Sequence, residues 1–175
     1  MRQAANGSKG GRGGAKSPAA AGPLVKHGWT LYAHPLLLDQ LDALSRKAMK
    51  ERNPQGDATK VLAWLTRAIF DEIPRDPTLK DYRQGHTLGK SNTHWFRDKY
   101  AGQFRLFFRY DSRAMVIIFA WANDEKTLRA RESKDDAYAV FRRMLSGGNP
   151  PGEWADLLKA CSTTDAVGRI KRRGP

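Results

Sequence analysis

The first part of the chain places apolar residues at the spacing of helix faces. One stripe consists of Leu37, Leu41, Leu44 and Ala48. Apolar residues three or four positions apart predict an amphipathic helix, which is expected here from about Pro35 to Arg52. Proline suits the first turn of a helix, where its missing N–H is not needed. The pair Asn53-Pro54 ends the helix.

A second stripe of the same kind follows after a short loop. It consists of Val61, Leu62, Leu65, Ile69 and Phe70. A helix from Ala58 to Ile73 accounts for this stripe, with Asp57 as its N-cap and Pro74 at its end. Two amphipathic helices joined by a short loop predict a helical hairpin.

Runs of β-prone residues predict strands on both sides of this hairpin. The first strand, Gly28 to Ala33, precedes it, and three follow, at Trp95 to Lys99, Phe104 to Tyr110 and Met115 to Trp121. The tight connection Asp111-Ser112-Arg113 joins the last two strands as a β-hairpin. MVIIFAW is apolar on both faces, which is typical of a central strand.

The pattern returns to helices near the C-terminus. Ser133 and Asp136 resemble a capping box for a helix that ends at Gly147-Gly148, and a short helix starts near Pro151. This order of elements predicts an α+β fold, with an N-terminal helical hairpin packed on a small, mainly antiparallel β-sheet and C-terminal helices after it. Residues 24–161 are expected to form one domain.

The two strands within WFRDKYAGQFRLFFRY separate basic from apolar side chains. Successive side chains of a strand point to opposite faces, so Arg97 and Lys99 share one side, as do Arg105 and Arg109. The opposite side carries Phe104, Leu106, Phe108 and Tyr110. The pattern predicts an apolar face for a core and a basic face for an anionic partner.

The charge balance also favours an anionic partner. The chain has 31 Lys and Arg against 18 Asp and Glu, a net charge of +13, which points toward RNA, DNA, an acidic protein or a membrane surface. Residues 1–23 contain no aromatic or β-branched residue, so we expect a disordered basic tail. Residues 162–175 are expected to be a second basic tail, in which residues 169–175 have no apolar pattern.

The cysteine, histidine and apolar content of the chain limits the expected cellular location and the expected cofactors. Cys161 is alone, so no internal disulfide can form, and a reducing cytoplasm fits. No apolar run approaches the roughly 18 residues of a membrane span, and the N-terminal segment lacks the apolar part of a signal peptide. The four histidines do not cluster with the cysteine, so we expect no metal and no other cofactor.

Several segments carry a resemblance to a known family. GQFRLFFRY, VIIFAWANDEKTLR, DDAYAVFRRML and GGNPPGEWADLL resemble the YhaV family of toxins from bacterial toxin–antitoxin modules. That family is similar to RelE, the type member of a group of compact α+β ribonucleases that act on messenger RNA. The resemblance runs from about Gly28 to Leu158. It implies an endoribonuclease (mRNA interferase) that cleaves mRNA at the ribosome without a metal, and a RelE-like fold.

The resemblance also implies the residues that carry the chemistry. A ribose 2′-hydroxyl attacks the adjacent phosphate, which requires a base, cations around the phosphate and an acid for the leaving oxygen. The expected basic pair falls on Arg97 and Lys99, the next-strand arginine on Arg105 and the tyrosine on Tyr138. Arg129 is assigned as the last catalytic residue, although Arg131 competes for this place.

Side-chain chemistry agrees with these roles but leaves alternatives open. Arginine grips phosphate oxygens in bidentate fashion, whereas Lys99 acts as a base only if its surroundings lower its pKa. Arg105 and Arg109 could instead form ion pairs with Asp124, Asp135 or Asp136. Tyr138 could be a core residue, and Asp124 could cap a turn or orient an arginine. The expected RNA-binding residues are Arg109, Arg131, Lys126, Lys90 and His94.

Two other functional classes compete with the ribonuclease. A basic α+β domain could hold RNA or DNA without cutting it. A DNA-binding repressor is less favoured, because the helices before residue 74 are nearly neutral. For the ribonuclease, the family resemblance implies a cognate AbrB-like, swapped-hairpin antitoxin, and an acidic segment of it could cover the basic face.

Overall fold

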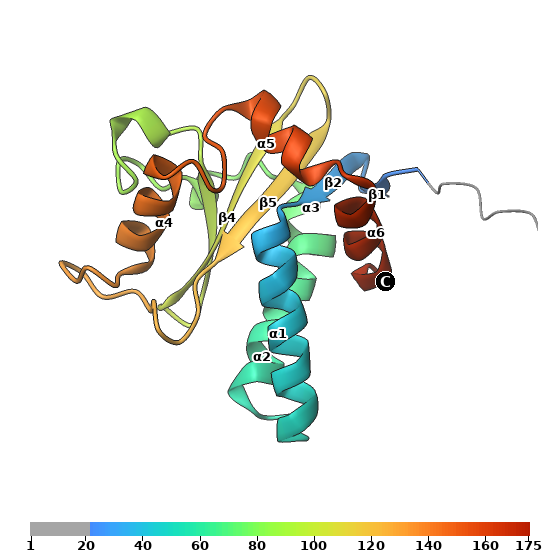
Figure 1. Ribbon diagram of the computed structural model, residues 1–175, viewed down its shortest axis with the longest axis vertical. Coiled ribbons are helices and arrows are strands. Elements are labelled where there is room, and N and C mark those ends of the chain that lie inside the picture. The colour runs from blue at the N-terminus through green and yellow to red at the C-terminus, as the bar shows by residue number, and fades with distance from the viewer. Residues whose placement is uncertain (1–21) are drawn as a thin grey trace, which may run out of the picture.

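A five-stranded mixed sheet forms the centre of the protein in a computed structural model that describes residues 22–175 (Figure 1). The strands lie in the order β1-β2-β5-β4-β3. They are β1 (Leu24–Lys26), β2 (Trp29–Ala33), β3 (Phe96–Tyr100), β4 (Phe104–Asp111) and β5 (Val116–Ala122). Among the strands of residues 22–175, only the β2–β5 pair is parallel. The predicted strands are confirmed to within two residues at most boundaries, and β1 is an addition to the prediction.

The central strand β5 is buried along nearly its whole length, as its apolar sequence predicts. It pairs with β2 on one side and with β4 on the other. The β4–β5 register shifts between Phe107 and Phe108, which marks a β-bulge. The expected α+β architecture with a mainly antiparallel sheet is therefore confirmed.

The predicted helical hairpin covers one face of the sheet. It consists of α1 (Pro35–Glu51) and α2 (Asp57–Arg67), continued by a π-helical turn (Ala68–Glu72) and the short α3 (Ile73–Arg75). Figure 1 shows the hairpin projecting from the sheet. Asp57 is the first helical residue and Gly56 the N-cap, so the N-cap prediction is wrong by one residue. Pro74 lies within α3, not after the last helical residue.

A second set of helices covers the opposite face. These are α4 (Ala137–Ser146) and α5 (Trp154–Cys161). They enclose a separate aromatic core in which the nearly parallel rings of Phe107, Trp121 and Phe141 all contact one another. The expected basic face is therefore largely an apolar core. The helix predicted from Ser133 begins three residues later, because Asp136 is the N-cap and accepts a hydrogen bond from the backbone N–H of Tyr138.

The predicted C-terminal tail is instead a helix, α6 (Thr164–Arg173), so this prediction is wrong. It packs beside β2 and the start of α1 (Figure 1). Ala166 and Ile170, four residues apart, are each 1% exposed and belong to the core that also contains the helical hairpin. The predicted N-terminal tail falls almost entirely on residues 1–21, which lie outside the described residues.

Two arginines of α6 fix this helix to α1. Arg169 and Arg173 both donate hydrogen bonds to the carboxylate of Asp42, and Arg169 also donates to Asp39. Partial burial alone would raise the pKa of Asp42, but the two arginines hold this pKa below its ordinary value. Two of the basic residues near the C-terminus thus hold α6 against α1. None of the helices formed by residues 22–175 is both long and apolar enough to cross a membrane.

Helix α6 should contribute to the stability of the domain. Ile170→Ala removes a side chain that is almost fully buried, and we expect it to lower the free energy of unfolding by about 2–5 kcal/mol. The matched control is Arg172→Ala on the exposed side of the same helix, expected to change stability by less than about 0.5 kcal/mol. Urea unfolding measures both. Equal stability of the two variants would show that α6 is dispensable.

Candidate active site

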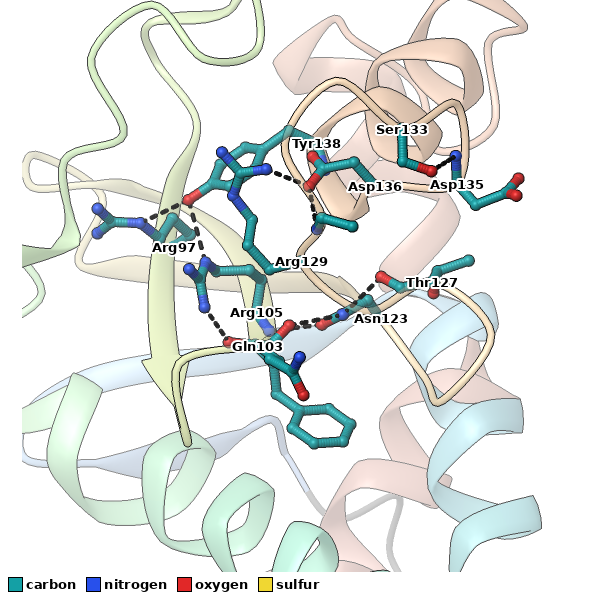
Figure 2. A network of polar contacts seen from close by, with 12 residues as sticks. Arg97, Gln103, Arg105, Asn123, Thr127, Arg129, Ser133, Asp135, Asp136 and Tyr138 are labelled. Carbon is teal, nitrogen blue, oxygen red and sulfur yellow. Dashed lines mark hydrogen bonds and ion pairs between the residues drawn. The ribbon is translucent and has the colours of Figure 1, made fainter.

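The hydroxyl group of Tyr138 lies between two arginines from neighbouring strands (Figure 2). It accepts a hydrogen bond from Nε of Arg97 on β3 at 2.9 Å and another from Nε of Arg105 on β4 at 3.2 Å. Arg97 also donates to the carbonyl oxygen of Asp81, and Arg105 to that of Phe104 at 2.7 Å. Both guanidinium groups are therefore held in place by hydrogen bonds.

The ring of Tyr138 is enclosed on several sides. The guanidinium of Arg129 lies 5.0 Å from the ring centre and that of Arg105 5.8 Å from it, while Phe107 makes an edge contact. Tyr138 is only 6% exposed and belongs to the aromatic core beneath α4 and α5. The side chain combines the two expected alternatives, because its ring is a core group while its hydroxyl contacts the arginines. A ring so enclosed has no open face for stacking on a base.

The long loop between β5 and α4 brings Arg129, and not Arg131, to this cluster. The guanidinium of Arg129 forms an ion pair with the buried carboxylate of Asp136. The backbone N–H of Arg129 donates to the carbonyl oxygen of Gln103 at 3.1 Å, which fixes the loop beside the β3–β4 turn. Arg131 is exposed and has no hydrogen bond within the described residues.

Lys99 lies next to Arg105 in the sheet. The two residues are register partners on β3 and β4, and directly paired side chains lie on the same face with Cβ atoms about 5 Å apart. Lys99 is exposed, whereas Arg105 is 7% exposed. The cluster thus combines three arginines held by protein groups with one exposed lysine.

Arg109, which was expected to bind RNA, packs against two tryptophan rings. Its guanidinium lies against the rings of Trp95 and Trp154, at 5.5 and 5.3 Å, and donates to the carbonyl oxygen of Gly152 at 2.6 Å. Burial lowers the pKa of Arg109. Four residues separate it from Arg105, about 13 Å along the strand. Arg109 therefore links β4 to the segment before α5.

The remaining expected RNA-binding residues do not converge on Tyr138. Lys90 is exposed in a short 3₁₀ turn, Lys90–Asn92, and His94 follows it. Burial, and then the charge of Arg109, lower the pKa of His94. Lys126 lines a groove of about 800 Å³ between the helical hairpin and the β3–β4 turn. Among residues 22–175, none of these three side chains forms a hydrogen bond with the arginines or the tyrosine of the cluster.

The sequence reasoning missed the role of Asn123. This buried side chain accepts a hydrogen bond from the backbone N–H of Arg105 at 2.5 Å and donates to the carbonyl oxygens of Gln103 and Thr127. In the sequence, this role is indicated only by the position of Asn123 directly after the buried strand β5. Asp124 caps its own turn by accepting from the N–H of Lys126 at 2.9 Å, so the turn-capping alternative applies to it.

The arrangement suits an anion with several oxygens. Guanidinium groups held in fixed orientations bind phosphate well, because they need little rearrangement when the ligand arrives. Within the part of the chain that the structure describes, no three His, Cys, Asp or Glu side chains are grouped in a way that could hold a metal ion. The chemistry of the cluster is therefore suited to a ligand that carries phosphate.

Comparison with known proteins identifies the family. The model of the YhaV toxin family, described as a toxin with endonuclease activity, of toxin–antitoxin system, matches residues 31–162. Toxin YhaV of Escherichia coli O6:H1 (strain CFT073) is 43% identical over 145 residues, which cover 78% of this chain and 94% of that relative. Ribonuclease toxin YhaV of Escherichia coli K12 is 41% identical over 150 residues, covering 81% and 97%. No solved structure matches the chain.

The chain therefore belongs to the YhaV family of toxins with endonuclease activity from toxin–antitoxin systems. The family assignment made from FRLFFRY and NDEKTLR is confirmed.

Substitution of Arg109 should affect stability more than activity. Arg109→Ala removes the contacts with two tryptophan rings and a carbonyl oxygen, and we expect it to lower the free energy of unfolding by about 1–3 kcal/mol. RNA cleavage by the folded fraction should stay close to that of the parent protein. Chemical unfolding and a cleavage assay measure the two effects. Normal stability together with strongly reduced cleavage would instead place Arg109 in contact with RNA.

Proposed function

We propose that this toxin is an endoribonuclease of RelE-like fold that cleaves mRNA at the ribosome, with the Tyr138 cluster as its active site. The observation that carries the proposal is the sharing of the Tyr138 hydroxyl by Arg97 and Arg105, with Arg129 against the same ring. The YhaV relative of Escherichia coli K12 is named a ribonuclease toxin, which supports RNA as the substrate.

The arginines are suited to bind the phosphate that is attacked. In both Arg97 and Arg105, Nε and Nη1 have protein acceptors, and Nη2 has none among residues 22–175. Each guanidinium therefore keeps donor capacity for a phosphate oxygen while its orientation is fixed. Negative charge grows on these oxygens as the 2′-oxygen attacks, so the arginines stabilise the transition state more than the substrate.

Tyr138 and Lys99 are the proposed proton-transfer groups. Both acceptor positions of the Tyr138 oxygen are used by Nε–H donors, so the tyrosine proton remains available for a substrate oxygen. Tyr138 gives this proton to the leaving 5′-oxygen. Lys99, which must be in its neutral amine form to act as a base, lies beside Arg105 and takes the proton from the 2′-hydroxyl. The new P–O2′ bond replaces the P–O5′ bond, and the products are a cyclic phosphate and a 5′-hydroxyl end.

The partners of the protein follow from its charge and its family. A net charge of +13 favours attraction to mRNA and to the ribosome. Membership of a toxin–antitoxin family supports a cognate antitoxin, and we propose an AbrB-like, swapped-hairpin protein with an acidic segment. Such a segment would neutralise the toxin by occupying the same arginine side chains that bind phosphate.

Arg105 is the most direct test of this site. Arg105→Ala removes one fixed cation, and we expect a fall in the single-turnover cleavage rate of about a hundredfold to a thousandfold. Arg113→Ala, in the exposed β4–β5 turn, removes the same charge elsewhere and should cleave normally. If the alanine variant does not fold, Arg105→Lys retains charge without the fork of donors and should still lose at least about tenfold. Full cleavage by a folded Arg105 variant would contradict the proposal.

Substitution of Lys99 separates its two possible roles, which are proton acceptor and phosphate-neutralising cation. Arginine keeps the positive charge but does not release a proton in the accessible pH range. If Lys99 is the base, Lys99→Arg should reduce single-turnover cleavage as much as Lys99→Ala does. If Lys99 only neutralises phosphate, the arginine variant should retain most of the activity and the alanine variant should not. The second result would remove Lys99 from the proton-transfer step.

A binding module without catalysis remains the second candidate function. It predicts that purified protein binds ribosomes or RNA with strong salt dependence but leaves mRNA intact. Incubation with ribosomes that carry a labelled mRNA, followed by analysis of RNA ends, distinguishes the two functions. A cyclic phosphate at the cut site supports the proposed reaction.

A further inference from the structure

Asp136 is a buried carboxylate that contacts both the loop and the helix that carry candidate catalytic residues. It is 5% exposed. One of its oxygens, Oδ1, accepts a hydrogen bond from the backbone N–H of Tyr138 at 3.0 Å. The other, Oδ2, accepts from the backbone N–H of Ala130 at 2.7 Å and from Nη1 of Arg129. Figure 2 shows this carboxylate between the loop and the first turn of α4.

The two oxygens of Asp136 have different tasks. An N-cap needs only one acceptor oxygen, and Oδ1 performs this task for α4. Oδ2 has no part in the cap and binds only groups of the preceding loop. A capping role alone therefore explains one of the three hydrogen bonds that the Asp136 carboxylate accepts.

The contact through Oδ2 decides where the Arg129 side chain lies. Arg129 belongs to a loop whose following residues, Ala130 to Glu132, are exposed, so this cation would be hydrated in the absence of a partner. Its side chain is only 20% exposed and that of Asp136 only 7%. The ion pair keeps the guanidinium 5.0 Å from the centre of the Tyr138 ring.

We propose that Asp136 is a positioning residue, which holds Arg129 in the active site and sets its orientation relative to Tyr138. This inference rests on the proposed function of the cluster. It goes further by separating the cap function of the carboxylate from a second function, exerted through Arg129. Because Asp136 acts through Arg129, loss of the carboxylate should matter only while Arg129 is present.

Asparagine separates the two functions. It is as good an N-cap as aspartate, so one oxygen can still accept from the N–H of Tyr138. Its second group is an NH₂, which is a donor and cannot accept from Nη1 of Arg129 or from the N–H of Ala130. Asp136→Asn should thus retain helix α4 and release Arg129. Asp136→Ser, which also caps but has no carboxylate, provides a second variant if the asparagine variant does not fold.

The experiment is a double-mutant cycle on single-turnover cleavage of mRNA on saturating ribosomes. Its members are the parent protein, Asp136→Asn, Arg129→Ala and the double variant, with Asp135→Asn as the matched control because Asp135 is an exposed neighbouring carboxylate. We expect Asp136→Asn to reduce the rate by about tenfold to a hundredfold, as displacement of a catalytic group does. The double variant should be no slower than Arg129→Ala.

Each outcome bears on a different claim. Cleavage by folded Asp136→Asn equal to that of Asp135→Asn, while Arg129→Ala is impaired, would overturn the positioning role and leave the proposed function intact. Independent losses that multiply in the double variant would show that Asp136 acts on stability or on another residue. Normal cleavage by Arg129→Ala would overturn the positioning role and remove Arg129 from the proposed active site.

Discussion

The site depends on how two arginines from neighbouring strands are kept close together. Arg97 and Arg105 carry like charges that repel each other, and Arg105 is nearly buried. The shared acceptor is the hydroxyl oxygen of Tyr138, assisted by the carbonyl oxygens of Asp81 and Phe104. The charge of Arg129, whose guanidinium lies against the ring of the same tyrosine, is paired with the buried carboxylate of Asp136. Positive charge is thus concentrated where a phosphate can bind.

The position of Tyr138 is in turn set by the aromatic core on the α4 side of the sheet. Phe107 contacts the rings of Tyr138, Trp121 and Phe141, and the cap at Asp136 fixes the start of α4. Asn123 fixes the beginning of β4 and the adjoining loop. Side chains outside the proposed active site therefore determine the geometry of those proposed to contact substrate.

The sequence predicted the parts of the fold that have long regular patterns. The helical hairpin, strands β2 to β5 and helix α5 all follow from apolar spacing, and the chemical types in the site followed from the family resemblance. Helix α6 was not predicted, because its two buried residues, Ala166 and Ile170, lie within a run dominated by basic side chains. The choice of Arg129 over Arg131 depends on the contact with Asp136, and the packing of Arg109 depends on Trp154, far away in sequence. Such contacts leave no local pattern.

The central claim is that the cluster around Tyr138 binds the phosphate at which RNA is cut. A crystal structure with an RNA blocked by a 2′-O-methyl group at the cleavage position tests it most directly. We predict that oxygens of this phosphate lie within about 3 Å of guanidinium nitrogens of Arg97 and Arg105, with the Tyr138 hydroxyl facing the 5′-oxygen. RNA bound instead in the groove between the helical hairpin and the β3–β4 turn, with no phosphate at these arginines, would contradict the account.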